Sequence, residues 1–247
     1  MSLRFWKTTR GRDFHPAVRP TYDARMNENA SIEIETGPNP QASVIILHGL
    51  GASGDDFVPV CEQMDLRTVG DVRYVLPHAP MRPVTVNNGF VMPAWYDIVA
   101  LAGQAHEDEA GLRASQGIVE SLIAREVQRG VASARIVVGG FSQGCAMALL
   151  TGLRHRDKLA GIVGLSGYLP LADTLAAERS AANQDTPIFL AHGRFDPMIA
   201  LPRASASRDA LTALGYHVQW HEYPMEHSVC LPEIEDLQRF LLQTLTR

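Results

Sequence analysis

The sequence predicts an α/β fold, with a mostly parallel central sheet and helices on both faces. Short apolar runs rich in β-branched residues, typical of buried strands, alternate along the chain with longer segments that suit helices. Strands that alternate with helices form parallel sheets covered on both sides. The chain has 247 residues, of which 46% are hydrophobic, and this suffices for one large core.

Each expected element follows from a local pattern. Alternation of polar and apolar residues at 31–35 predicts an edge strand, and a continuous apolar run at 42–47 predicts a central strand. Further strands are expected from Arg135 onward and at 72–76, 159–165, 187–191 and 217–223. Helices are expected at 55–64, 107–129, 143–153, 204–214 and 231–245.

Two stretches show neither the helical nor the strand period of apolar residues. Residues 81–97 show no helical or strand pattern and are expected to form a long loop, which inside a compact domain is usually functional. Residues 168–185 form a short segment with room for one or two helical turns. The sequence therefore predicts no large lid domain.

The chain divides into an N-terminal arm over residues 1–30 and a single α/β domain over residues 31–247. The first 25 residues carry six basic against two acidic side chains, and Pro16 and Pro20 interrupt any long helix there. We expect a solvated, flexible arm, with docking of the arm on the acidic body as the alternative. The prolines count against an amphipathic targeting peptide.

Composition excludes several classes of function. The net charge of −5 supplies no general attraction for nucleic acid or an anionic membrane. Three cysteines without C-x-x-C spacing predict neither a disulfide framework nor a zinc site and favour a reducing compartment, so we expect the protein in the cytoplasm. No apolar run approaches the roughly 20 residues of a membrane helix, and no secretory signal is visible.

The strongest local motif is Gly140-Phe141-Ser142-Gln143-Gly144, a G-x-S-x-G between an apolar run and a helical segment. This pattern is typical of a nucleophile elbow, a sharp strand-to-helix turn that exposes a serine hydroxyl. Glycines are needed because neighbouring backbone passes too close for a Cβ. The alternative is a glycine-rich loop in which the serine only caps the helix.

A serine nucleophile needs a base to take its proton and an acid to orient that base. Polar loops follow later strands in the order Ser142, Asp196, His227, the order of the α/β-hydrolase fold. Because functional groups gather beyond the carboxyl ends of parallel strands, we expect these three to meet. Taken alone, Asp196 before proline could be a turn and His227 a solvated loop residue.

Other polar residues fit the roles less well. Asp185 lies before its strand and so at the opposite edge of the sheet, whereas His192 ends a strand and is expected to support the Asp196 loop. His48 and His78 end strands near the site. For the oxyanion, the expected donors are backbone N–H groups, those of Gln143 and of Leu50. The expected mechanism needs no metal or organic cofactor.

Six motifs recur in a fixed order: His48-Gly49-Leu50-Gly51, Pro77-His78-Ala79-Pro80, Met92-Pro93-Ala94-Trp95-Tyr96-Asp97, Gly140-Phe141-Ser142-Gln143-Gly144, His192-Gly193-Arg194-Phe195-Asp196 and Met225-Glu226-His227. On these motifs residues 40–245 resemble the phospholipase/carboxylesterase family of small α/β-hydrolases, which includes bacterial carboxylesterases and acyl-protein thioesterases. The resemblance implies Ser142 as nucleophile, Asp196 as orienting acid and His227 as general base. It also implies Leu50 and Gln143 as oxyanion donors and allows a homodimer.

The chain departs from the family pattern at Cys145, where glycine is common, which puts a tight helix–strand contact in doubt. We expect a serine carboxylesterase that hydrolyses short-to-medium acyl esters through an acyl-enzyme. Its substrate pocket would have Trp95 and Leu169 as walls, unless Trp95 only packs the loop onto the body. The alternatives are an acyl-protein thioesterase or lysophospholipase with the same triad, and a non-catalytic α/β-hydrolase relative that acts as a binding module.

Overall fold

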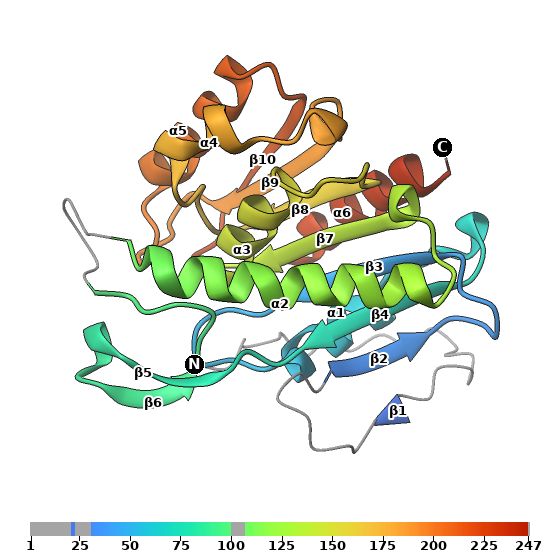
Figure 1. Cartoon of the computed structure of the whole chain (residues 1–247), viewed down its shortest axis with the longest axis horizontal. Helices are drawn as coiled ribbons and strands as arrows, with labels where there is room; N and C mark the ends of the chain where they lie inside the picture. The colour runs from blue at the N-terminus through green and yellow to red at the C-terminus, as the bar shows by residue number, and fades with distance from the viewer. Residues whose placement is uncertain (1–20, 23–30, 100–106, 247) are drawn as a thin grey trace.

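The computed structural model describes residues 21–22, 31–99 and 107–246 (Figure 1). Its main sheet contains, in spatial order, β1 (Thr21–Tyr22), β2 (Ser31–Glu35), β4 (Val72–Pro77), β3 (Ala42–Leu47), β7 (Ile136–Phe141), β8 (Gly161–Leu165), β9 (Ile188–Gly193) and β10 (Val218–Tyr223). The strands from β4 to β10 in this order are parallel to one another, whereas β1 and β2 are antiparallel to their neighbours. The expected α/β-hydrolase fold is confirmed.

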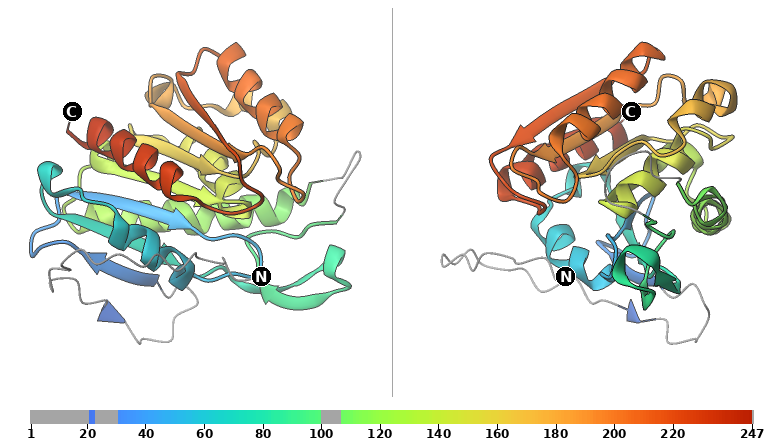
Figure 2. Two further views of the ribbon diagram at one scale, coloured as in Figure 1. Left: turned by 180° about the vertical axis from the view of Figure 1, so that it is seen from behind. Right: turned by 90° about the vertical axis from the view of Figure 1, so that its left-hand side faces the viewer.

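Helices cover both faces of the sheet, as Figure 2 shows. They are α1 (Val58–Gln63), α2 (Glu109–Gln128), α3 (Gln143–Gly152), α4 (Ala172–Glu178), α5 (Leu201–Ala213) and α6 (Leu231–Leu245). Helices α1 and α6 pack on one face, and α2 and α3 pack on the other. The segment that carries α4 is short, and no large lid is present among the described residues.

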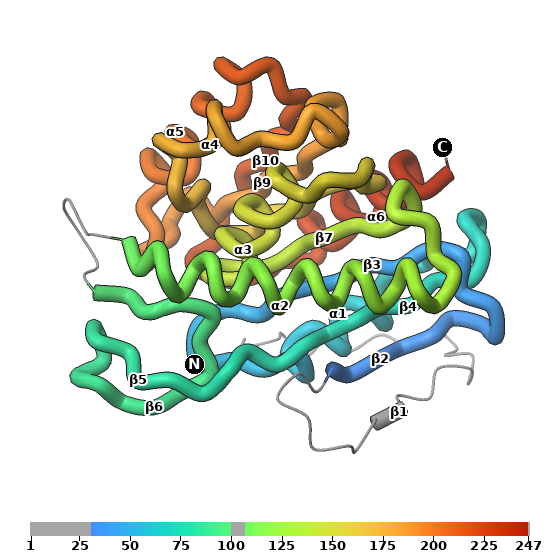
Figure 3. The backbone as a smooth tube through the Cα atoms, in the orientation of Figure 1, coloured from blue at the N-terminus to red at the C-terminus, as the bar shows by residue number. Residues whose placement is uncertain are grey.

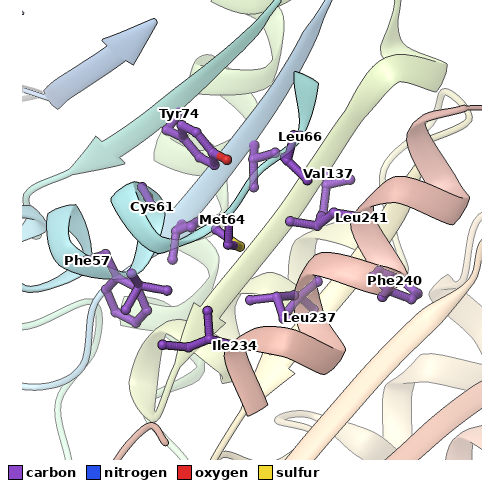
Figure 4. Packing of buried hydrophobic residues seen from close by; sticks show 14 of the residues in the cluster. Phe57, Cys61, Met64, Leu66, Tyr74, Val137, Ile234, Leu237, Phe240 and Leu241 are labelled. Atoms are coloured by element: carbon purple, nitrogen blue, oxygen red, sulfur yellow. The ribbon is translucent and has the colours of Figure 1, made fainter. Parts of the chain in front are cut away.

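The core under α6 follows from its sequence period. Ile234, Leu237 and Leu241 recur every three or four residues, so they share one face of the helix. That face meets Cys61 of α1 and Val137 of β7 in a single hydrophobic cluster (Figure 4). Full burial of a leucine-sized side chain contributes about 1.5–3 kcal/mol, so this face fixes α6, which directly follows the His227 loop.

Proline positions explain where two helices differ from expectation. The segment expected as one helix at 55–64 is a 3₁₀ turn, Gly54–Phe57, followed by α1, which has Pro59 near its start. Helix α5 begins at Leu201, three residues earlier than expected, with Pro202 in its first turn. Proline suits a first helical turn because the N–H it lacks would have no partner there.

The prediction that residues 81–97 have no regular structure is wrong. Strands β5 (Met81–Val84) and β6 (Phe90–Pro93) pair as an antiparallel hairpin that projects beyond the carboxyl ends of the main strands (Figure 3). Asn88 (φ 55°) and Gly89 (φ 75°) adopt the left-handed conformation of the turn. Each strand has four residues and contains a proline, which cannot donate to a ladder, so the strand pattern is hidden in the sequence.

The outer edge of the sheet also differs from expectation. The strand expected at an edge is β2, but Thr21 and Tyr22 pair with its outer side as β1. The rest of the arm expected over residues 1–30 lies outside the described residues. Among the helices that the structure describes, none has the length and apolar character needed to cross a bilayer.

A buried carboxyl group begins α6. Glu233 is fully buried, and its Oε2 accepts the backbone N–H of Cys230 at 3.4 Å in a capping box. Burial raises the pKa of Glu233 from 4.5 to about 8, against the opposing effect of the Cys230 N–H. Folding therefore favours the protonated acid. The stability that the buried, protonated Glu233 contributes is fully present below pH 4.5 and is lost as the pH rises through about 8.

We predict that Glu233→Gln changes the pH dependence of unfolding. Glutamine keeps an oxygen to accept the Cys230 N–H but cannot ionise, so the variant should be more stable than wild type at alkaline pH. The difference should shrink toward mildly acidic pH. Urea denaturation at a series of pH values measures this, and parallel curves for the two proteins would contradict it.

Candidate active site

The G-x-S-x-G motif forms the sharp turn between β7 and α3. Ser142 has φ 57° and ψ −116°, a strained conformation for a residue other than glycine. A Cβ on Gly144 would lie 1.9 Å from the carbonyl oxygen of Leu47, and one on Gly140 would lie 2.3 Å from the carbonyl carbon of Gly144. Backbone therefore fills the space around the turn, and the turn holds Ser142 at the carboxyl end of β7.

The structure brings Ser142, His227 and Asp196 together in one hydrogen-bonded relay. His227 Nδ1 lies 2.7 Å from Asp196 Oδ2, and His227 Nε2 lies 2.9 Å from Ser142 Oγ. Because a carboxylate can only accept, Nδ1 carries the proton and donates it to Asp196. In the neutral ring Nε2 is then free to accept the serine hydroxyl. This is the tautomer that a general base requires.

Backbone bonds hold the loops of Asp196 and His227 against each other. The N–H of Arg194 donates to the Tyr223 carbonyl at 2.8 Å, and that of Phe195 to the Met225 carbonyl at 3.1 Å. A Cβ on Gly193 would lie 2.4 Å from the carbonyl oxygens of both Met225 and Glu226. Glycine at this position therefore lets the end of β9 approach the loop that carries His227.

Asp196 is stabilised as an anion although its side chain is fully buried. Burial alone would raise the pKa of Asp196, but hydrogen bonds from His227, Ile199 and Met198 outweigh it and place the pKa below the ordinary value. The two backbone N–H groups donate to Oδ1 at 2.9 and 2.8 Å. Asp196 is thus ionised although, among the described residues, no arginine or lysine pairs with it.

His192 supports the same loop, as the sequence suggested. Its Nε2 lies 2.8 Å from the carbonyl oxygen of Ile199 and 3.5 Å from Asp196 Oδ2. Burial lowers the pKa of His192, so the ring is neutral and its Nε2–H donates to Ile199. Asp185 instead forms an ion pair with Lys158 away from this relay.

The two residues expected to supply the oxyanion donors adjoin Ser142 or a residue packed against it. Gln143 is the first residue of α3, directly after Ser142, and its N–H has no intrahelical partner. Leu50 lies in the loop after β3, where a Cβ on Gly49 would be 3.2 Å from the Ser142 Cβ. Among the described residues, neither N–H donates to another protein group. Both donors are therefore available at the turn.

Trp95 links these two donor segments. Its backbone N–H donates to the Gln143 side-chain oxygen at 3.0 Å, and its indole N–H donates to the His48 carbonyl at 2.9 Å. The Gln143 amide also donates to the Tyr96 carbonyl at 2.8 Å. This use of the Gln143 side chain was not predicted from the sequence, where the only signal is a polar amide at a helix position that is otherwise apolar.

The two expected pocket walls are both buried and lie in different clusters. Trp95 is 0% exposed and packs with residues of α2 and α3, a placement that matches the alternative of a packing role. Leu169 is 6% exposed and packs with residues of α3, α4 and α5, while its N–H donates to Ser207 Oγ at 2.9 Å. Their role as substrate walls stays a prediction.

Cys145 fits its position because glycines face it. A Cβ on Gly164 would lie 2.7 Å from the Cys145 sulfur, and a Cβ on Gly167 would lie 2.4 Å from the Cys145 Cβ. The sequence left a tight helix–strand contact at Cys145 in doubt. Because the residues that face Cys145 are glycines, the cysteine side chain fits between the helix and the facing backbone.

Comparison with known proteins identifies the family. Residues 27–245 match the family described as Phospholipase/Carboxylesterase. The chain belongs to this family. It is therefore a hydrolase that acts on ester or thioester bonds, as the sequence predicted.

Two proteins of similar sequence carry the same name. Acyl-protein thioesterase 1 of Neurospora crassa is 43% identical over 215 residues, which cover 83% of this chain and 88% of that protein. The protein of the same name from Yarrowia lipolytica is 44% identical over 209 residues, covering 83% and 92%. A solved structure, acyl-protein thioesterase 2 of Zea mays, superposes with a TM-score of 0.75 at 29% identity, covering 86% of this chain and 98% of that one.

We predict that Gly144→Ala is strongly destabilising and that Gly117→Ala is not. The new methyl group at 144 would collide with the Leu47 carbonyl, and such overpacking costs about 1–3 kcal/mol or more. Gly117 lies in α2 with nothing within 4 Å of its Cβ position, so alanine there should stabilise by about 0.5–1 kcal/mol. Denaturant unfolding measures both, and equal stability of the two variants would refute the close approach.

Proposed function

We propose that this chain is a serine hydrolase that cleaves acyl esters and thioesters through a covalent acyl-enzyme. The observation that carries the proposal is the continuous relay from Ser142 Oγ through the His227 ring to Asp196, with contacts of 2.9 and 2.7 Å. Serine, neutral imidazole and ionised carboxylate in this order form a nucleophile, its base and the group that orients the base.

In the first half of the cycle, Ser142 Oγ attacks the carbonyl carbon of the substrate while His227 Nε2 takes the hydroxyl proton. The oxyanion of the tetrahedral intermediate accepts the N–H groups of Leu50 and Gln143. Asp196 stabilises the imidazolium that forms. His227 then donates its proton to the leaving alcohol or thiol, and the acyl group remains on Ser142.

In the second half, water attacks the acyl-enzyme. His227 takes a proton from that water, and the new oxyanion occupies the same two donors. Collapse of the intermediate breaks the bond to Ser142 Oγ, which regains a proton from His227, and the carboxylic acid leaves. The chain's own residues perform each proton transfer in this cycle.

The surroundings of the relay suit an apolar acyl chain. Phe195 and Met198, on either side of Asp196, are 66% and 46% exposed. The base of the hairpin joins the oxyanion loop, because the Gly51 N–H donates to the Pro93 carbonyl at 2.8 Å. Apolar surface therefore borders the site, and within the part of the chain that the structure describes no large lid encloses a long acyl chain. We accordingly propose short-to-medium acyl esters as substrates.

A second candidate is the removal of acyl groups from protein thioesters. The observation that favours it is the name acyl-protein thioesterase 1, which relatives 43% and 44% identical to this chain carry. The chemistry at Ser142 is the same for both candidates. They differ in acyl-chain length and in whether the leaving group is a small alcohol or a cysteine in a polypeptide.

We predict that Ser142→Ala lowers kcat/KM for a simple nitrophenyl ester by at least ~10⁴-fold, because the acyl-enzyme cannot form. A fluorophosphonate should label wild type on Ser142 and leave the variant unlabelled. Ser121→Ala, at an exposed position in α2, serves as the control and should retain full activity. Comparable activity in the Ser142 variant would reject the assignment of the nucleophile.

A panel of substrates separates the two candidates. We expect higher kcat/KM for butanoyl and octanoyl esters than for palmitoyl esters, because the open site leaves the end of a long chain in water. A preference for an S-palmitoyl peptide over the matched octanoyl ester would establish the second candidate instead. The Ser142→Ala variant should be inactive on every member of the panel in either case.

A further inference from the structure

The His48 imidazole is fully buried beside the oxyanion loop, and backbone groups occupy both of its nitrogens. The Ala79 N–H lies 2.9 Å from Nε2, and Nδ1 lies 2.7 Å from the carbonyl oxygen of Gly49. A backbone N–H can only donate, so Nε2 is the acceptor and Nδ1 carries the proton. The ring therefore donates Nδ1–H to the Gly49 carbonyl.

That carbonyl belongs to the peptide group that also contains the Leu50 N–H. A peptide group is planar and trans, so its C=O and N–H point in opposite directions. The Gly49 carbonyl accepts a second bond, from the Ala52 N–H at 3.2 Å. Holding the carbonyl on one side therefore fixes the direction of the Leu50 N–H on the other.

The preceding peptide group is fixed as well. The Trp95 indole N–H donates to the His48 carbonyl at 2.9 Å, and the Trp95 and His48 rings lie 5.4 Å apart. Both peptide groups that flank Gly49 are thus anchored by buried side chains. Gly49 itself lies against Ser142, so this anchored segment borders the reacting hydroxyl.

We propose that His48 is a positioning residue that aims the Leu50 N–H at the oxyanion by holding the Gly49 carbonyl. The proposal rests on the proposed function of Ser142. His48 takes no part in proton transfer, because both nitrogens are engaged with backbone. Burial lowers the pKa of His48 to about 4, so the ring is neutral at neutral pH, and its two backbone hydrogen bonds select the tautomer.

Two substitutions test the hydrogen bonds of the two ring nitrogens one at a time. In His48→Asn, the side-chain amide nitrogen can take the place of Nδ1 and donate to Gly49, but nothing replaces the acceptor for Ala79. In His48→Gln, the side-chain oxygen can take the place of Nε2 and accept from Ala79, but the donor to Gly49 is lost. Each variant therefore removes one of the two hydrogen bonds and leaves the other.

We expect His48→Gln to lower kcat roughly tenfold to a hundredfold with little change in KM. Loss of a whole oxyanion donor costs ~10²–10³, and misalignment of one costs less. His48→Asn should retain more of the wild-type kcat. The rates are measured per active site, titrated with a fluorophosphonate, so that unfolded protein does not count. Affinity for a trifluoromethyl ketone, which binds serine as an oxyanion, should fall in parallel with kcat.

Three results would overturn the proposal. One is a His48→Gln variant whose kcat per titrated site stays within about twofold of wild type. Another is a His48→Asn variant at least as impaired as the glutamine variant, which indicates a role for the Ala79 bond or for packing alone. If wild type itself were not labelled on Ser142, the proposed function would fail and this proposal with it. A His48→Gln variant that is still labelled on Ser142 but has a low kcat would support the role of His48 and leave the proposed function intact.

Discussion

The site depends on backbone segments that approach one another more closely than side chains would allow. Gly144 lies against the Leu47 carbonyl, and Gly193 lies against the carbonyls of Met225 and Glu226. The first contact fixes the turn that exposes Ser142, and the second brings the loop of His227 to the loop of Asp196. Parallel strands make such contacts possible because their carboxyl ends share one edge of the sheet.

Neutral and anionic groups at this edge are held by backbone hydrogen bonds more than by ion pairs. Asp196 is ionised because backbone N–H groups and His227 donate to it, whereas His48 and His192 are neutral because they are buried. Fixed dipoles of this kind need no reorganisation when charge develops in a transition state.

Local sequence patterns were sufficient to predict most of the strands and helices. The strand at β3 and the helix α6 begin and end where expected, because continuous apolar runs and a three-to-four residue period are local signals. The hairpin of β5 and β6 was not recognised. Its strands are short and carry Pro83 and Pro93, and its stability comes from pairing and from contact with the oxyanion loop, which the local sequence does not encode.

For the site, the sequence by itself determined the residue types and the order Ser142, Asp196, His227, since the elbow motif and the positions after strands are properties of the chain. Only the tertiary structure decided which groups touch. The distances within the relay and the burial of Trp95 depend on contacts between residues far apart in sequence. The hydrogen bonds of His48 depend likewise on folding, because the partner of its Nε2 is 31 residues away.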